Sequence, residues 1–484
     1  MSKRLQITRS ANATAVLSNG EMQWDFASQK LRIHDGSTAG GRVVIDMTQT
    51  GFGYVFPTPL AAGGAAFDWS VSPTESILYA SDAQADDYFG QSVSINGDAT
   101  YAIVGAYGED GGAGDPISST GAAYIFTRSG STWTEQTILR AADRQAGDNF
   151  GFSVSIGSDG DYAIVGAYSE DGGSGDPTSG AGAAYIFTRS GSTWSQQAIL
   201  RASDRQASDQ FGYSVSMSSD GSYAIVGTPG EDTNGSAAGA AYIFTRSGST
   251  WTQQAKIQSS DIQATDSFGW SVSINSDGDY AIIGANYDTT VAATYAGSAY
   301  IFTRSGSTWT QQAKLTASDA QGDDYFGYSV SINGDGDYAI VGANGEDTGG
   351  SSAGAAYIFT RSGSTWTQQQ KIQSSDIQAN DNFGISVSMS SDGDYAVVGA
   401  YGENGGPGDP INAAGAAYVF TRSGSTWTEQ AILRASDAQS VDRLGQTVSI
   451  SGDGAYAITG APYEDGGAGN PISYAGAAYI YEAG

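Results

Sequence analysis

The chain has 484 residues and carries 51 acidic against 21 basic side chains, a formal net charge of −30 at pH 7. This balance argues against nucleic acid as a partner, because phosphates require clusters of Lys and Arg, and against an anionic membrane surface. The absence of cysteine and the single histidine, His34, argue against thiol chemistry, Cys/His zinc sites and His-based catalysis. No apolar run approaches the roughly 18 residues of a membrane span, so no membrane insertion is expected.

Residues 1–46 contain short alternating segments separated by Asn-Gly and Asp-Gly pairs, which predict small β-hairpins. So small a sheet buries little surface, and its stability is expected to need association with other copies. The run LSNGEMQWDFASQKLRIHDGSTAGGRVVI resembles the N-terminal module of tailed-phage fibre and tropism-determinant proteins. The matching residues are Gly20-Glu21, Leu31, Ile33, Asp35-Gly36 and Gly40-Gly41. The resemblance implies attachment to other virion proteins, usually as a homotrimer.

Residues 47–66 mix Gly, Pro and small residues without periodicity, which is typical of a linker. Residues 67–484 are organised as a repeat, marked by a Phe-Gly pair, an AYIF segment and a tryptophan. The Phe-Gly pairs begin at Phe89, Phe150, Phe211, Phe268, Phe326 and Phe383, with Leu444-Gly445 as a seventh copy, at spacings of 61, 61, 57, 58, 57 and 61 residues.

Each repeat predicts four strands, written FGxSVSI, YAIVGA, GAAYIFTR and WTQQAKI, joined by short Gly-containing turns. Six repeats carry their own tryptophan, and Trp69, within residues 67–80, supplies a seventh ahead of the first Phe-Gly pair. A chain that begins with the last strand of its final repeat closes a ring. We therefore predict an all-β fold, a seven-bladed β-propeller of four-stranded blades closed by an N-terminal strand, over a linear solenoid.

The repeated motif resembles the FG-GAP-type repeats of bacterial surface proteins and integrin-like propellers, over residues 67–484. In that family a calcium loop resembling D-x-[DN]-x-D-G-x-x-D stands just before the Gly-Ala pair. Here Ser155 and Gly157 stand where acids are expected, and Tyr162 or Ala163 replaces the last aspartate. The resemblance therefore does not extend to the residues of that calcium loop.

Strand order predicts that the Asp-Gly-Asp and Arg-Ser-Gly-Ser turns lie at one end of the blades. That end carries a ring of arginines, for which we favour structural pairing between turns over ligand binding: Arg128, Arg189, Arg246, Arg304, Arg361 and Arg422.

The opposite end carries longer, acidic loops in repeats 6, 7, 1 and 2, with the pattern Y-x-E-D-G-G-x-G-D-P. Loops on a rigid scaffold commonly carry recognition, and an aromatic ring beside carboxylates suits sugar binding. The alternative is that these loops pack on their neighbours or on a second subunit. The candidate ligand-binding residues are Tyr107, Glu109, Asp110, Asp115, Tyr168, Glu170, Asp171, Asp176, Tyr401, Glu403, Asp409, Tyr463, Glu464 and Asp465.

An aspartate pair spaced five residues apart precedes every Phe-Gly pair. The pairs are Asp82/Asp87, Asp143/Asp148, Asp204/Asp209, Asp261/Asp266, Asp319/Asp324, Asp376/Asp381 and Asp437/Asp442. Their recurrence favours a structural task, because Asp side chains bond backbone N–H groups in tight connections. The second hypothesis is calcium, with Asp82, Asp87, Asp143, Asp148, Asp204 and Asp209 among its ligands.

Acids repeated in register by every blade do not mark one catalytic site, so no enzymatic activity is expected. We interpret the chain as a phage virion protein, a tail-fibre or host-recognition component whose propeller binds a host surface glycan or protein. The start MSKRLQITRS lacks the apolar segment of a secretory signal, as expected for a protein released by lysis. Two alternatives are a bacterial surface adhesin and a virion decoration protein that binds only other virion proteins.

Overall fold

The computed structural model describes residues 67–111, 117–172, 178–290, 293–406, 411–466 and 472–484, together with three strands near the N-terminus. The chain divides into two compact units, residues 1–62 and 63–484. In the first unit β1 (Met22–Asp25), β2 (Lys30–Ile33) and β3 (Arg42–Asp46) form an antiparallel sheet in that order. The predicted linker at 47–66 lies outside the described residues. The described part contains no helix long and apolar enough to cross a membrane.

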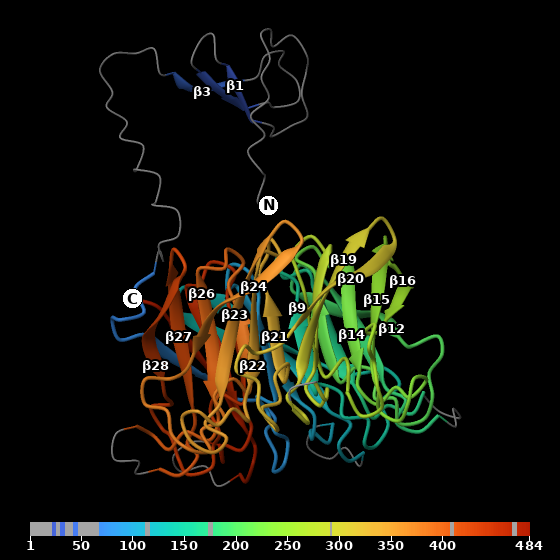
Figure 1. Cartoon of the computed structure of the whole chain (residues 1–484). Helices are drawn as coiled ribbons and strands as arrows, with labels where there is room; N and C mark the ends of the chain where they lie inside the picture. Colours follow the sequence, from blue (N-terminus) through green and yellow to red (C-terminus); the bar gives the residue numbers. More distant parts are fainter. Residues whose placement is uncertain are drawn as a thin grey trace. The chain divides into compact units, whose positions relative to one another are not determined.

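The second unit is a ring of seven four-stranded antiparallel sheets, which confirms the predicted all-β seven-bladed propeller. Blades 1 to 3 are β5 (Ser92–Ile95), β6 (Tyr101–Ala106), β7 (Ala122–Ser129), β8 (Thr132–Leu139); β9 (Ser153–Ile156), β10 (Tyr162–Ala167), β11 (Ala183–Ser190), β12 (Thr193–Leu200); and β13 (Ser214–Met217), β14 (Tyr223–Thr228), β15 (Ala240–Ser247), β16 (Thr250–Ile257). In Figure 1 the blades are seen from the side.

Blades 4 to 6 repeat the same order. They are β17 (Ser271–Ile274), β18 (Tyr280–Ala285), β19 (Ser298–Ser305), β20 (Thr308–Leu315); β21 (Ser329–Ile332), β22 (Tyr338–Ala343), β23 (Ala355–Ser362), β24 (Thr365–Ile372); and β25 (Val387–Met389), β26 (Tyr395–Ala400), β27 (Ala416–Ser423), β28 (Thr426–Leu433). Blade 7 combines β29 (Thr447–Ile450), β30 (Tyr456–Ala461) and β31 (Ala477–Glu482) with β4 (Thr74–Leu78) from the start of the propeller.

The pairing of β31 with β4 closes the ring, with Ala478 opposite Leu78 and Glu482 opposite Thr74. The ring closure therefore follows the prediction, and the solenoid alternative is wrong. One detail is corrected, because the strand begins at Thr74 and Trp69 precedes it. The Trp69 side chain is buried in the same apolar cluster as Tyr395 of blade 6, and its indole N–H donates to the Gly454 carbonyl oxygen at 2.9 Å.

The repeated Phe-Gly and Gly-Ala-Ala segments join neighbouring blades. Phe150 is fully buried and packs its ring against Tyr185 and Phe187 of its own blade, with centroids 5.3 and 6.0 Å away. Its backbone forms a parallel bridge with Gly121 of the preceding blade. A Cβ on Gly121 would lie 1.9 Å from the Phe150 carbonyl oxygen, so this approach requires glycine.

The innermost strand of a blade has a free edge, and serine hydroxyls of the preceding blade accept hydrogen bonds from its N–H groups. The Ser94 hydroxyl of blade 1 accepts the Ile156 N–H of blade 2 at 3.2 Å, and Ser92 accepts the Val154 N–H at 3.0 Å. An unpaired strand edge would otherwise leave buried donors without partners. The alternating serines of the Ser-Val-Ser-Ile segment thus replace a sheet ladder between blades.

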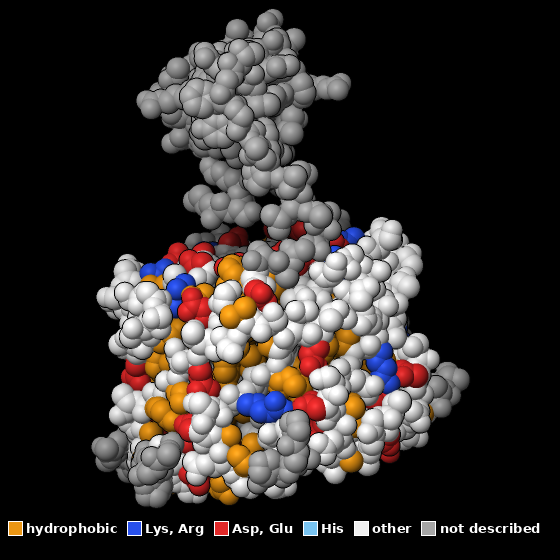
Figure 2. All heavy atoms as spheres, turned by 90° about the vertical axis from the view of Figure 1, so that its left-hand side faces the viewer, with side chains coloured by type: hydrophobic (Ala, Val, Ile, Leu, Met, Phe, Trp, Pro, Cys, Tyr) orange, Lys and Arg blue, Asp and Glu red, His pale blue; other side chains and the backbone are white. Residues whose placement is uncertain are grey.

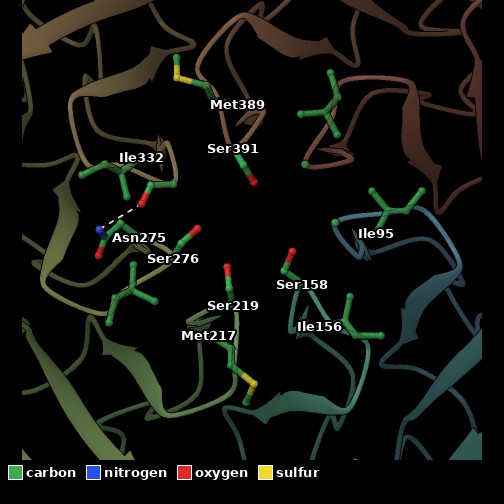
Figure 3. Close-up of a pocket in the computed structure, with 15 residues that line it drawn as sticks. Ile95, Ile156, Ser158, Met217, Ser219, Asn275, Ser276, Ile332, Met389 and Ser391 are labelled. Atoms are coloured by element: carbon green, nitrogen blue, oxygen red, sulfur yellow. Dashed lines mark hydrogen bonds between the residues drawn. The ribbon is translucent and has the colours of Figure 1, made fainter. Parts of the chain in front are cut away.

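At one end of the propeller axis the turns that follow the innermost strands form a closed belt of backbone hydrogen bonds. The N–H donors and their carbonyl acceptors are Gly97 to Ser158, Asp159 to Ser219, Ser219 to Ser276, Ser276 to Gly334, Gly334 to Ser391, Ser391 to Gly452 and Gly452 to Gly97. The belt surrounds a cavity of about 130 Å³. Figure 3 shows four serine side chains directed toward its centre, those of Ser158, Ser219, Ser276 and Ser391.

Candidate binding face

Antiparallel pairing separates the loops of each blade into two faces of the propeller. The turn face carries the Asp-Gly-Asp and Arg-Ser-Gly-Ser turns. The loop face carries the loops that follow β6, β10, β14, β18, β22, β26 and β30, together with the connections into the next blade. In Figure 1 the loop face is the lower edge of the propeller.

The arginines of the turn face are engaged within the molecule. The Arg189 Nε–H donates to the Gly160 carbonyl oxygen at 2.7 Å, and its guanidinium lies over the Tyr101 ring of the preceding blade, 4.6 Å from the centroid. The other five are Arg128 over Tyr456, Arg246 over Tyr162, Arg304 over Tyr223, Arg361 over Tyr280 and Arg422 over Tyr338. These contacts link adjacent blades and agree with the structural interpretation.

The glutamates predicted to face a ligand lie in the interior of the loop face. Glu109, Glu170 and Glu403 are buried, and each carboxylate is paired with the arginine of its own outermost segment: Arg140 at 3.0 Å, Arg201 at 2.8 Å and Arg434 at 3.0 Å. Glu464 is also buried and accepts the Gly466 N–H at 2.6 Å. Figure 2 shows basic side chains of the propeller wall next to acidic ones. These four carboxylates anchor loops and are not offered at the surface.

The predicted aspartates of the same loops brace the loop ends. Asp110 accepts the Ser119 N–H, Asp171 the Gly180 N–H and Asp465 the Tyr474 N–H, at 2.7, 2.7 and 3.0 Å. The remaining three candidates, Asp115, Asp176 and Asp409, lie outside the described residues.

The predicted tyrosines join a continuous aromatic surface. Tyr107 stacks on Tyr88 at 5.1 Å and meets Phe152 edge-on at 5.8 Å, and Phe152 in turn contacts Tyr168 at 4.5 Å. Tyr463 contacts Tyr88 at 5.6 Å.

Tyr401, the fourth predicted tyrosine, connects to Tyr463 through Arg443. The Arg443 guanidinium lies 5.3 Å from the Tyr401 centroid and 4.3 Å from that of Tyr463. The structure thus brings together the four tyrosines that the repeat places in four different blades.

Sequence reasoning missed the aromatics at the variable position of FGxSVSI. Tyr213, Trp270 and Tyr328 stand there in blades 3, 4 and 5, and their rings follow one another at 4.8 and 5.5 Å. Phe152 holds this position in blade 2 and contacts Tyr213 at 5.0 Å. The signal was available, because this position varies widely while the glycine before it is the same in all seven repeats. Its residues are Gln91, Phe152, Tyr213, Trp270, Tyr328, Ile385 and Gln446.

We call this connected set the aromatic belt: Tyr463, Tyr474, Tyr88, Tyr107, Phe152, Tyr168, Tyr213, Trp270, Tyr287 and Tyr328. Its rings are mostly half-buried, and Tyr474 is 38% exposed. Burial, with nearby phenols adding to it, raises the pKa of Tyr328 to about 12. The pKa of Tyr213 is raised for the same reasons, so both phenols remain protonated and able to donate at neutral pH.

The paired aspartates have separate structural roles. The first member bonds across the blade junction, as Asp82 does with the Tyr124 hydroxyl at 2.8 Å and with Arg140 at 2.9 Å. The second member is buried and accepts a backbone N–H three residues before it, as Asp87 does from Gln84 at 2.6 Å.

The other candidate metal ligands follow this division. Asp143 pairs with Arg201 and Asp204 with Lys256, whereas Asp148 accepts the Gln145 N–H and Asp209 the Gln206 N–H. Within the described ranges, no group of three His, Cys, Asp or Glu side chains is placed to hold a metal ion. The calcium hypothesis therefore has no defined ligand set in this part of the chain.

Comparison with protein families matches the FG-GAP repeat seven times along the chain. The matched residues are 73–126, 133–187, 194–244, 251–302, 309–359, 366–420 and 427–481. Comparison with curated proteins gives no match.

Proposed function

The chain belongs to the FG-GAP repeat family, and on that premise we propose that this propeller is a binding domain for carbohydrate on a host cell surface. The loop face would supply the contacts, and binding would involve no chemical conversion of the ligand. We further propose that the protein is a phage virion component of the tail-fibre or host-recognition class.

The observation that carries the proposal is the aromatic belt. Aromatic rings stack on the apolar C–H faces of sugars, and phenol hydroxyls can exchange hydrogen bonds with sugar hydroxyls. A surface that joins the rings of six blades offers several stacking positions within one ligand's reach. The net charge of −30 favours a neutral ligand over an anionic one.

Placement on a virion is supported by the sequence of the N-terminal unit. The Gly20-Glu21, Asp35-Gly36 and Gly40-Gly41 pairs resemble the attachment module of phage fibre proteins. We propose that this unit associates as a homotrimer and docks onto other virion proteins, leaving the propeller to meet the host. Immunogold labelling of purified particles with an antibody to this chain tests the proposal, and unlabelled particles contradict it.

Binding of the full-length chain to glycan arrays and to candidate host cells tests the loop face. Replacing Tyr107 and Tyr474 together by alanine is expected to weaken binding by about tenfold or more, because two rings of one surface are lost. Replacing both by phenylalanine keeps the rings and is expected to retain most of the affinity.

The control is Val71→Ala, which truncates an apolar side chain that is 54% exposed outside the aromatic belt. It should bind as the native chain does, and all variants should melt cooperatively. Equal binding by the native chain and the double alanine variant would exclude the aromatic belt as the receptor site. Binding to virion proteins but to no cell or glycan would favour the decoration function.

A further inference from the structure

Blade 4 differs from the blades on either side of it at the outer edge of the loop face. In blade 3 the Gln258 carboxamide donates to Glu231 Oε2 at 2.9 Å and to the Gly239 carbonyl oxygen at 2.9 Å. In blade 5 Gln373 makes the same two bonds, to Glu346 at 3.0 Å and to Gly354 at 3.1 Å. A glutamine and a glutamate therefore fill this region in both neighbours.

In blade 4 both of these side chains are shorter. Asp288 stands in place of the glutamate, and Thr316 stands in place of the glutamine, two residues after the lysine that all three blades share. The space is open as a cavity of about 490 Å³. That volume lies within the roughly 300–1,000 Å³ of typical small-molecule sites.

The shared lysine is more exposed in blade 4 than in blades 3 and 5, as expected beside a cavity that opens to solvent. The Lys314 side chain is 28% exposed, against 20% for both Lys256 and Lys371. Lys314 is the next-to-last residue of β20. Among the described outer strands β8, β12, β16, β20, β24 and β28, only β20 has an exposed residue next to last.

The charges in the cavity disfavour an anionic ligand. The Lys314 ammonium is 2.7 Å from Asp261 Oδ2 and 2.7 Å from Asp288 Oδ2, so two carboxylates already share one cation. Partial burial opposes the charge of Lys314, but these two bonds prevail and hold its pKa above the usual value. The trio has a net charge of −1 and offers no uncompensated cation.

The same group retains capacity to accept hydrogen bonds. Asp261 is 47% exposed, and its two oxygens accept one hydrogen bond each, from Lys314 at 2.7 Å and from the Tyr300 hydroxyl at 3.1 Å. A carboxylate has about four acceptor positions, so part of the acceptor capacity of Asp261 remains for a ligand. Ala317 and Ala320 form an apolar part of the cavity wall.

We propose that this cavity is a subsite for one neutral sugar residue. Two adjacent sugar hydroxyls donate to the Asp261 carboxylate, and an apolar face of the ring lies against Ala317 and Ala320, with Thr316 also lining the cavity. The inference rests on the proposed carbohydrate-binding function and adds a second contact region to the aromatic belt.

Titration calorimetry of the full chain with neutral methyl glycosides of glucose, galactose, mannose and N-acetylglucosamine tests the subsite. The decisive variant is Asp288→Glu with Thr316→Gln, which installs the pair that blades 3 and 5 already accommodate. We expect at least about a tenfold loss of affinity, because the new carboxamide occupies the ligand's space. Thr308→Gln, the same change at the opposite end of β20, is the matched control and should bind as the native chain does.

The outcomes separate this inference from the proposed function. Unchanged affinity in the double variant overturns the subsite, as does native protein that binds none of the four glycosides or prefers methylammonium. In those cases the aromatic-belt variants still decide whether the loop face binds host glycans. Loss of affinity in the double variant alone, with an unchanged melting temperature, supports the subsite.

Discussion

At the scale of single residues, the repeat depends on glycines that allow neighbouring blades to approach. Gly121 combines a positive φ of 77° with a backbone contact across the blade junction, where a Cβ would lie 1.9 Å from the Phe150 carbonyl oxygen. Gly130, in the next turn of the same blade, has a φ of 62° and no atom within 4 Å of an added Cβ. Both positions require a positive φ, and only Gly121 also lies against the backbone of the next blade.

We predict that Gly121→Ala destabilises the propeller much more than Gly130→Ala. The second change carries only the cost of a left-handed alanine, about 1–2 kcal/mol. The first adds a clash that forces two blades apart, and a total above about 3 kcal/mol is expected. Equilibrium denaturation in urea measures both, and equal losses would show that the approach between the blades does not limit this position.

At the scale of elements, closure of the ring depends on a short segment that is far from its partners in sequence. β4 has only five residues, and the preceding loop inserts Trp69 into the cluster that contains Tyr395. In blades 2 to 6 the corresponding tryptophan donates to a glutamine of the preceding blade, as Trp194 does to Gln136 at 3.0 Å. Trp69 lies outside the strand. It packs with Tyr395 of the preceding blade, but its indole N–H donates to the Gly454 carbonyl oxygen of its own blade.

We predict that Trp69→Ala costs about 3–5 kcal/mol, since it removes a buried indole and its hydrogen bond at the closing blade. Trp133→Ala removes a side chain that is only partly buried and is expected to cost clearly less. Thermal unfolding of the two variants gives the comparison. If Trp69→Ala lost less stability than Trp133→Ala, pairing of β31 with β4 would suffice to close the ring.

At the scale of the whole molecule, each of the seven repeats contributes one buried aspartate, the second member of its aspartate pair. These are Asp87, Asp148, Asp209, Asp266, Asp324, Asp381 and Asp442. Burial raises the pKa of Asp87 to about 7. The backbone hydrogen bond from Gln84 lowers this pKa, and the neighbouring carboxylates raise it further. The pKa values of five others are raised to about 6, also chiefly by burial.

These shifts predict that the propeller is more stable in mild acid than at pH 8. In the unfolded chain these aspartates lose their protons above their ordinary pKa of 3.8. In the folded chain they keep them to a higher pH. Between about pH 4 and pH 7 the folded state therefore binds more protons, and its stability falls as the pH rises. Melting temperatures measured from pH 8 to pH 5 should increase.

The variant Asp87→Asn isolates one of these groups. Its carboxamide oxygen can still accept the Gln84 N–H, and stability at pH 8 is expected to rise by on the order of 1 kcal/mol with a shallower pH dependence. Asp86→Asn makes the same charge change at an exposed neighbour and should leave the pH dependence as it is. Equal effects of the two variants would attribute the pH dependence to net charge.

Much of the fold could be predicted from local patterns. Alternation within Ser-Val-Ser-Ile and Tyr-Ala-Ile-Val predicted the strands, and the count of tryptophans predicted closure by the segment around Trp69. The exact start of β4 escaped, because the extra residues around Pro73 have no counterpart in the other blades. Of the candidate site, the loop tyrosines were predicted to lie on one face, while the position of each carboxylate was not.

The sequence by itself determined the seven-fold repeat, the four strands of each blade and the two faces, because strand period and turn chemistry act over a few neighbouring residues. The tertiary structure decided which side chains remain available. Glu109 is buried beside Arg140, which follows β8 and lies 31 residues away in sequence. The aromatic belt exists because Tyr213 and Trp270, 57 residues apart, meet where two blades adjoin. Contacts of this kind depend on how blades pack, which no local pattern encodes.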